Sequence, residues 1–142
     1  KSKNGWIILT IYVARNRRKK GLKMLSVISV FAGGGIGSVL RYLVSSRIGS
    51  HWGIMTVNLL GALIIGIVYH FVSVRTGLRS EVKAFLMTGM LGGFTTFSTY
   101  MLDFCLLMGR QQTAEAFLYL LGSLMLGVAF LYLGIYAGKI LF

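Results

Sequence analysis

The chain has 142 residues, of which 56% are hydrophobic and only 13% are charged. Soluble domains carry about 25% charged residues, so too few polar side chains are present here to cover a surface in water. The composition therefore excludes a soluble enzyme and predicts a single-domain integral membrane protein. The net charge of +12 does not indicate nucleic-acid binding, because the basic residues lie in a short N-terminal tail and at the ends of apolar segments, with no aromatic platform beside them.

Residues 1–23 differ from the rest of the chain. The apolar stretch 6–13 is too short to cross a bilayer, and a dense basic run follows it: Arg15, Arg17, Arg18, Lys19, Lys20 and Lys23. One interpretation is an interfacial helix anchored on anionic headgroups. The other, which we favour, is that the natural protein begins at Met24 and that residues 1–23 are an upstream extension of a domain spanning 24–142.

Four apolar segments follow, each long enough to cross a hydrocarbon layer of about 30 Å. They cover residues 25–44, 54–74, 82–108 and 114–142. The polar connectors between them are short, so neighbouring helices are expected to run antiparallel. The segments lack the two-residue alternation of membrane strands. The sequence predicts an all-α integral membrane protein with four transmembrane helices.

Small residues at four-residue spacing recur in every segment. In lipid, helices associate where small side chains let their backbones approach closely. The pairs are Gly33 with Gly37, Gly34 with Ser38, Ala62 with Gly66, Gly89 with Gly93, Ser123 with Gly127, and Gly134 with Gly138. We therefore expect tight packing of all four helices.

The third segment is the least regular. Gly92 and Gly93 each weaken a continuous helix by about 1 kcal/mol relative to alanine, and four hydroxyl residues and Asp103 follow them. We infer a break in the helix at these glycines. Carbonyl groups freed there either bind a cation, as in other discontinuous membrane helices, or are satisfied by the neighbouring Thr hydroxyls at a simple kink. The residues alone leave both interpretations open.

Other motifs are weaker. The run 33–38 is a relaxed dinucleotide fingerprint, but the required strand before it and the acidic residue after it are missing. Cys105, His51 and His70 lack the spacing of metal ligands. Neither pattern supports a site.

The basic residues also bear on orientation. Twelve of them lie on the side of the N-terminus, second connector and C-terminus, and three lie on the other side, which predicts cytoplasmic termini. Without residues 1–23 the balance is four to three. Such a balance specifies no orientation and would permit an antiparallel dimer.

Several strings resemble the Fluc family of fluoride channels, in order and at family spacing from Met24 to the C-terminus. They are GGGIG at 33–37 with Arg41, TVNLLG at 56–61, TGMLGGFTTFST at 88–99, and GS at 122–123. The resemblance implies a dual-topology homodimer in the plasma membrane, with two antiparallel pores that export fluoride passively. It also implies a structural sodium ion at the dimer interface and no enzymatic activity.

Site residues are carried over position by position. The backbone carbonyls of Gly92 and Thr95 match the sodium ligands of the family. Phe97 matches a pore phenylalanine whose ring edge lines the fluoride path, and Asn58 matches the pore asparagine that donates to the ion and orients the aromatic rings. The remaining matched pore or vestibule positions are Ser98, Thr99, Tyr119, Ser123 and Arg41.

One position departs from the family pattern, because Tyr100 stands where the second pore phenylalanine is expected. Its ring edge is still positively polarised, but its hydroxyl changes the space beside the ion. Either a homodimer conducts through a modified site, which we favour, or the chain pairs with a related subunit in a heterodimer.

Two other classes of membrane protein would require a different pattern of polar residues. Small multidrug transporters have four short helices, but they depend on a carboxylate in the first span, and none is present here. A membrane scaffold would need no polar stripe, whereas Asn58 and the hydroxyls of the third segment form one. Polar residues within spans are costly and mark function.

Overall fold

The computed structural model describes the backbone of residues 3–142 and the side chains of residue 21 and of residues 23–142. The basic tail predicted at 1–23 lies, apart from Gly21 and Lys23, outside the described side chains. In the described part every regular element is a helix. The elements are α1 (Lys3–Ile48), α2 (Ser50–Val74), α3 (Ser80–Lys83), the π-helix η1 (Ala84–Leu91), α4 (Gly92–Phe94), α5 (Phe97–Gly109) and α6 (Thr113–Leu141).

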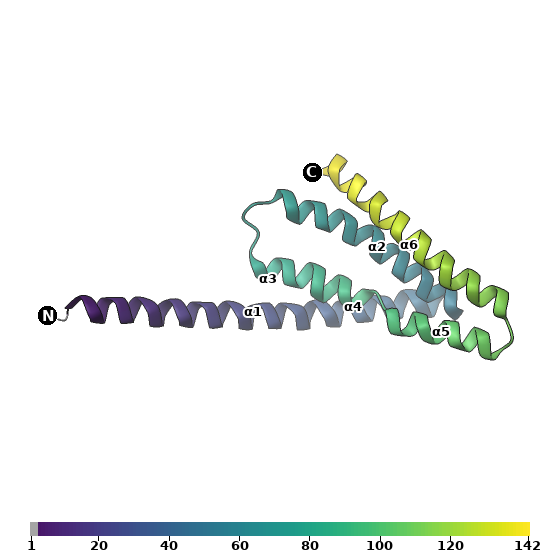
Figure 1. The fold of residues 1–142 in the computed structure, drawn as a ribbon, viewed down its shortest axis with the longest axis horizontal. Coiled ribbons are helices and arrows are strands. Elements are labelled where there is room, and N and C mark those ends of the chain that lie inside the picture. Colours follow the sequence, from purple (N-terminus) through teal and green to yellow (C-terminus); the bar gives the residue numbers. More distant parts are fainter. Residues whose placement is uncertain (1–2) are drawn as a thin grey trace.

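The helices form two closely packed groups (Figure 1). Helices α2 and α6 lie side by side over most of their length, and α3, η1 and α4 run along α1. Helix α5 turns away after α4 and packs against α6. The third apolar segment is therefore built from several short helices, whereas the other segments are continuous.

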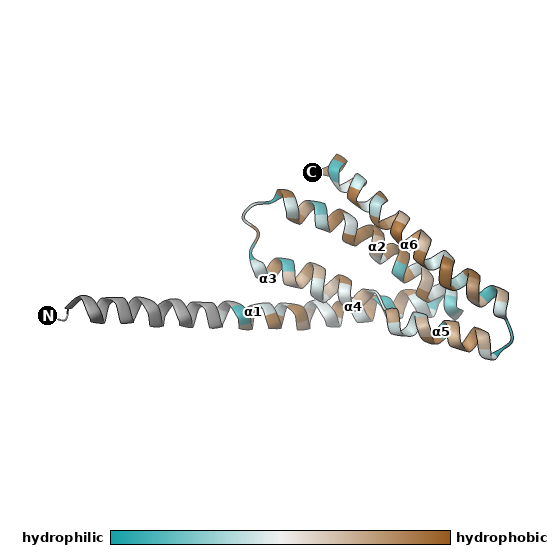
Figure 2. Ribbon diagram, in the orientation of Figure 1, coloured by the Kyte–Doolittle hydropathy of each residue, from teal (hydrophilic) through white to brown (hydrophobic). Residues whose placement is uncertain are grey.

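Among the described residues, three helical stretches are long and apolar enough to cross a bilayer: Lys23–Ile48, Ser50–Val74 and Thr113–Leu141. Hydrophobic residues recur along α2 and α6 from end to end (Figure 2). Large apolar side chains face outward, among them Phe31, Leu118 and Met125, which are 83%, 73% and 75% exposed. A soluble monomer rarely exposes so much apolar surface. The prediction of an all-α membrane protein is confirmed.

Glycines allow the closest helix contacts. A methyl group on Gly33 would lie 2.5 Å from the carbonyl oxygen of Phe85, and one on Gly93 would lie 2.6 Å from that of Gly34, so α1 touches η1 and α4 backbone to backbone. Gly134 meets the Leu63 carbonyl in the same way and joins α6 to α2. These contacts confirm most of the small-residue pairs as packing positions.

Gly127 is an exception. Nothing lies within 4 Å of the methyl group that an alanine would place there. Gly127, the second member of the predicted pair with Ser123, therefore makes no close helix contact within the described chain.

Candidate functional site

The site is built around an interruption between α4 and α5. Thr95 and Thr96 have extended backbones, with ψ angles of 157° and 124°. The sequence placed the break at Gly92 and Gly93, and that position is wrong: Gly92 is helical, with φ −65° and ψ −35°. The glycines serve close packing instead, and the helix ends three residues later, where side chains from other helices take over the backbone hydrogen bonds.

Asn58 on α2 holds the second residue of the interruption. Its amide nitrogen donates to the Thr96 carbonyl at 3.0 Å, and its side-chain oxygen accepts from the Thr96 N–H at 2.9 Å. In a continuous helix that N–H would donate to the Gly92 carbonyl. A primary amide has two N–H groups, so the contact with Thr96 uses one and leaves the other for a different acceptor.

Arg41 on α1 stabilises Thr95, the first residue of the interruption. Its guanidinium donates to the Thr95 carbonyl at 3.1 Å. The resemblance implies that Arg41 lies in a vestibule. In the structure its guanidinium contacts the backbone of the interruption. Two helices that precede this segment in the sequence thus fix its shape.

A cavity of about 290 Å³ lies beside the interruption. It is lined by Asn58, Gly61, Ala62, Ile65, Thr95, Thr96, Phe97, Tyr100, Ser123 and Leu124. Four of the predicted pore residues, Asn58, Phe97, Tyr100 and Ser123, are therefore brought together. The Ser123 hydroxyl is buried and has no hydrogen-bond partner within the described chain. A small polar ligand in the cavity would supply one.

The predicted hydroxyl residues Ser98 and Thr99 lie at the start of α5 but do not line this cavity. They gather around Thr96, whose Oγ1 is 3.4 Å from Ser98 Oγ and 3.1 Å from Thr99 Oγ1. Thr96 also accepts the Thr99 N–H and so caps α5, as Thr commonly does at a helix start. Thr96 was not among the predicted site residues, although a Thr directly before a helix is a capping signal.

The aromatic rings form a row from α5 to α6. Phe97 is 68% exposed, whereas Tyr100 and Tyr119 are 3% and 1% exposed. The ring centroids of Phe97 and Tyr100 are 5.9 Å apart, and those of Tyr100 and Tyr119 are 5.1 Å apart. The Tyr100 hydroxyl, which distinguishes this chain from the family pattern, donates to the backbone carbonyl of Leu120 on α6. Its ring still lines the cavity.

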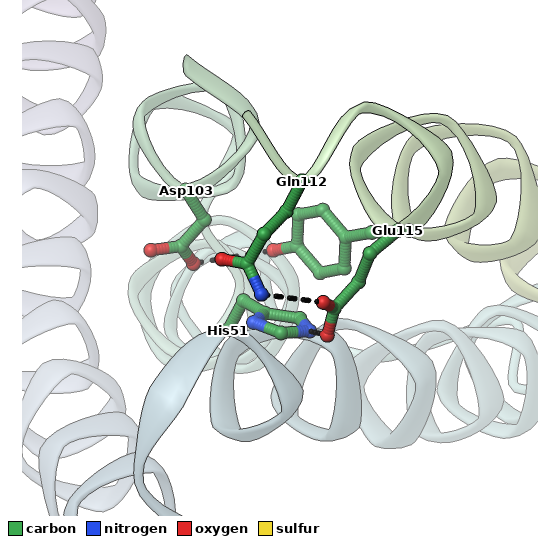
Figure 3. A network of polar contacts seen from close by, with 5 residues as sticks. His51, Asp103, Gln112 and Glu115 are labelled. Carbon is green, nitrogen blue, oxygen red and sulfur yellow. Dashed lines mark hydrogen bonds and ion pairs between the residues drawn. The ribbon is translucent and has the colours of Figure 1, made fainter. Parts of the chain in front are cut away.

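A second polar cluster joins the starts of α2 and α6 (Figure 3). Glu115 Oε1 is 3.3 Å from His51 Nε2, and Glu115 Oε2 accepts from Gln112 at 2.9 Å. The His51 ring packs edge-on against Tyr119, whose hydroxyl donates to Asp103 at 3.2 Å. This cluster was not predicted as a unit, because His51, Asp103 and Glu115 lie in different segments of the sequence and only the fold brings them together.

Cation binding would depend on backbone oxygens. Within the described chain no three His, Cys, Asp or Glu side chains are grouped to hold a metal. The Gly92 carbonyl loses its helical partner because the Thr96 N–H donates to Asn58, and Gly92 is exposed. The Thr95 carbonyl accepts from Arg41 and keeps a second lone pair. These two oxygens suit a hard cation, although Arg41 places a positive charge beside one of them.

Known proteins match this chain over most of its length. The family model described as CrcB-like protein, Camphor Resistance (CrcB), matches residues 28–135. A protein of Agrobacterium fabrum named Fluoride-specific ion channel FluC is 39% identical over 125 residues, which cover 84% of this chain and 100% of the relative.

Two further relatives carry the same name. That of Methylobacterium nodulans is 43% identical over 75% of this chain and 90% of its own length, and that of Aquifex aeolicus is 38% identical over 80% and 96%. These names denote channels, in agreement with the prediction that the chain is not an enzyme. They also confirm the resemblance found in the motifs. The chain belongs to the CrcB-like protein family.

Proposed function

We propose that this chain is a fluoride-selective channel that lets fluoride leave the cell passively and so lowers its toxicity in the cytoplasm. The observation that carries the proposal is the cavity beside the interruption, which is lined by Asn58, Phe97 and Ser123, and the hydroxyl of Ser123 is buried without a partner in the described chain. The names of the relatives support the same ion.

The chemistry of the cavity suits a small, strongly hydrated anion. Removing water from such an ion is very costly unless donors replace it. The second N–H of Asn58, the Ser123 hydroxyl and the positively polarised edge of Phe97 are such donors, and none carries a full charge. Weak neutral donors let the ion leave again, and larger anions would be excluded by the width of the path once a second subunit encloses it. Ser98 and Thr99 would extend the path beside the cavity.

The proposed assembly is an antiparallel, dual-topology homodimer in the plasma membrane, with four transmembrane segments and two pores. In a single chain Phe97 is largely exposed, so a second subunit is needed to enclose the path. The charge balance of residues 24–142 fits insertion in both orientations. A heterodimer with a related subunit is the alternative assembly.

We also propose a structural sodium ion at the dimer centre, held by the Gly92 and Thr95 carbonyls of both subunits. The lost helical partner of Gly92 and its exposure support this position. The ion would supply positive charge near the two pores. Conduction itself would depend on the side chains of the cavity.

Fluoride release from liposomes containing the purified protein tests the proposal. We expect rapid release by the unmodified chain and release at the level of empty liposomes by Phe97→Ile. Phe104→Ile is the matched control on the same helix, since Phe104 packs against Phe117 and does not line the cavity. If the unmodified protein releases no more fluoride than empty liposomes, the channel function is wrong. Full release by an assembled Phe97→Ile protein would remove the ring from the path.

A further inference from the structure

A second cavity lies away from the proposed fluoride site. It has a volume of about 350 Å³ and is lined by Leu25, Ser29, Arg79, Glu81, Val82, Phe85 and Leu86. It shares no residue with the cavity beside the interruption. Its walls come from the start of the apolar part of α1 and from the segment that leads through α3 into η1.

Glu81 gives this cavity its chemistry. The residue is 8% exposed, and its Oε2 lies 3.5 Å from Arg79 Nε. Its other oxygen, Oε1, is buried and has no hydrogen-bond partner in the part of the chain that the structure describes. A buried carboxylate oxygen without a donor is unfavourable. Arg79 meets Glu81 through one nitrogen, and its side chain is 72% exposed, so most of the guanidinium is free to meet another group.

The position of the cavity indicates the kind of ligand. The candidate membrane span of α1 begins at Lys23, and Leu25 lies just inside it. Arg79 and Glu81, which line the same cavity, lie where the polar connector after α2 leads into α3. The cavity is therefore at the end of the spans, where lipid headgroups meet the hydrocarbon. Its apolar walls and its paired charges require an amphipathic ligand.

We propose that this cavity binds the headgroup of a phospholipid that carries a primary amine, of the ethanolamine type. The ammonium group would donate to Glu81 Oε1, and the phosphate would accept from the exposed part of the Arg79 guanidinium. Leu25, Val82 and Phe85 would contact the glycerol and the upper acyl chain. One zwitterionic headgroup thus complements both charges of the cavity.

The proposal distinguishes ethanolamine from choline. A primary ammonium has three N–H donors, whereas the quaternary ammonium of choline has none and is much bulkier. A charge-assisted hydrogen bond in a poorly hydrated site is among the stronger polar contacts. We expect a preference of about tenfold for ethanolamine over choline headgroups, lost in steps as the amine is methylated.

Competitive lipid binding to the purified protein, followed by native mass spectrometry with equal amounts of ethanolamine and choline phospholipids, tests the site. Glu81→Gln should remove the preference. Glu115→Gln, which removes the same charge at the other end of the bundle, should keep it. Equal binding of both headgroups by the unmodified protein, or an unchanged preference in Glu81→Gln, would overturn the proposal.

Two further outcomes are informative. If Glu81→Gln does not fold, the methylated headgroup series on the unmodified protein decides the question alone. If Glu81→Gln alters subunit association while the unmodified protein shows no headgroup preference, Glu81 pairs with a second chain and the lipid site is refuted. Fluoride release by Glu81→Gln is not expected to change, so a refuted lipid site would leave the proposed channel function unaffected.

Discussion

Replacing Asn58 by Leu should destabilise the protein by breaking the support of the helix interruption. The side chains have similar volume, but Leu offers no partner to the N–H and carbonyl of Thr96, which now bond Asn58 at 2.9 and 3.0 Å. Each unpaired backbone group costs about 1–3 kcal/mol. Water can enter the adjoining cavity and partly replace the amide, so we expect a total loss of about 2–4 kcal/mol in the free energy of unfolding.

Unfolding in mixed micelles of increasing SDS content measures this loss, and hydrogen exchange of the Thr96 amide reports the broken bond directly. Asn58→Asp is the matched variant, because a carboxylate still accepts the Thr96 N–H but cannot donate to the carbonyl. Its second oxygen would face the Thr96 carbonyl without a donor, so this variant should lose at least as much stability as Asn58→Leu while its Thr96 amide stays protected. If the free energy of unfolding of Asn58→Leu lies within about 0.5 kcal/mol of that of the unmodified protein, and its Thr96 amide is equally protected from exchange, Asn58 does not stabilise the interruption.

Three other changes test single contacts. Gly134→Ala should cost about 1–3 kcal/mol of stability by forcing α6 away from α2, whereas Gly127→Ala should be close to neutral; equal effects in SDS unfolding would contradict the packing argument. Tyr100→Phe should lose about 0.5–1.5 kcal/mol, because the donor to the Leu120 carbonyl is gone, yet still release fluoride from liposomes, and loss of release would show that the hydroxyl serves conduction. Ser123→Ala should leave stability nearly unchanged but slow fluoride release about tenfold, equal to about 1.4 kcal/mol in the barrier; an unchanged rate would mean that this hydroxyl does not contact the ion.

The helical membrane architecture could be predicted because it depends on properties that a sequence displays directly. Long apolar runs give continuous helices such as α2 and α6, and small residues at four-residue spacing give contacts such as that of Gly33 with η1. The third segment was harder. Two glycines favour a break by local propensity, but the packing of Gly93 against Gly34 keeps the helix intact there.

The candidate site was partly predictable for a related reason. Asn58, Phe97 and Ser123 were found through motifs, and the fold brings them to one cavity. The contact between His51 and Glu115 carries no local signal, because the two residues lie on different helices and meet only when α2 and α6 pack. Contacts of this kind depend on side-chain direction across helices, which spacing along one helix does not reveal.

The way in which Arg41 and Asn58 hold the interruption bears on the order of membrane insertion. Both residues precede Thr95 in the chain, and they lie on helices that are long enough to enter the bilayer unaided. The short helices of the third segment expose backbone groups that lipid cannot satisfy. Because its partners precede it in the chain, we expect them to be in the membrane already when that segment leaves the ribosome. The helices α1 and α2 thus supply hydrogen-bond partners for the third segment, whose interrupted backbone lipid alone would not satisfy.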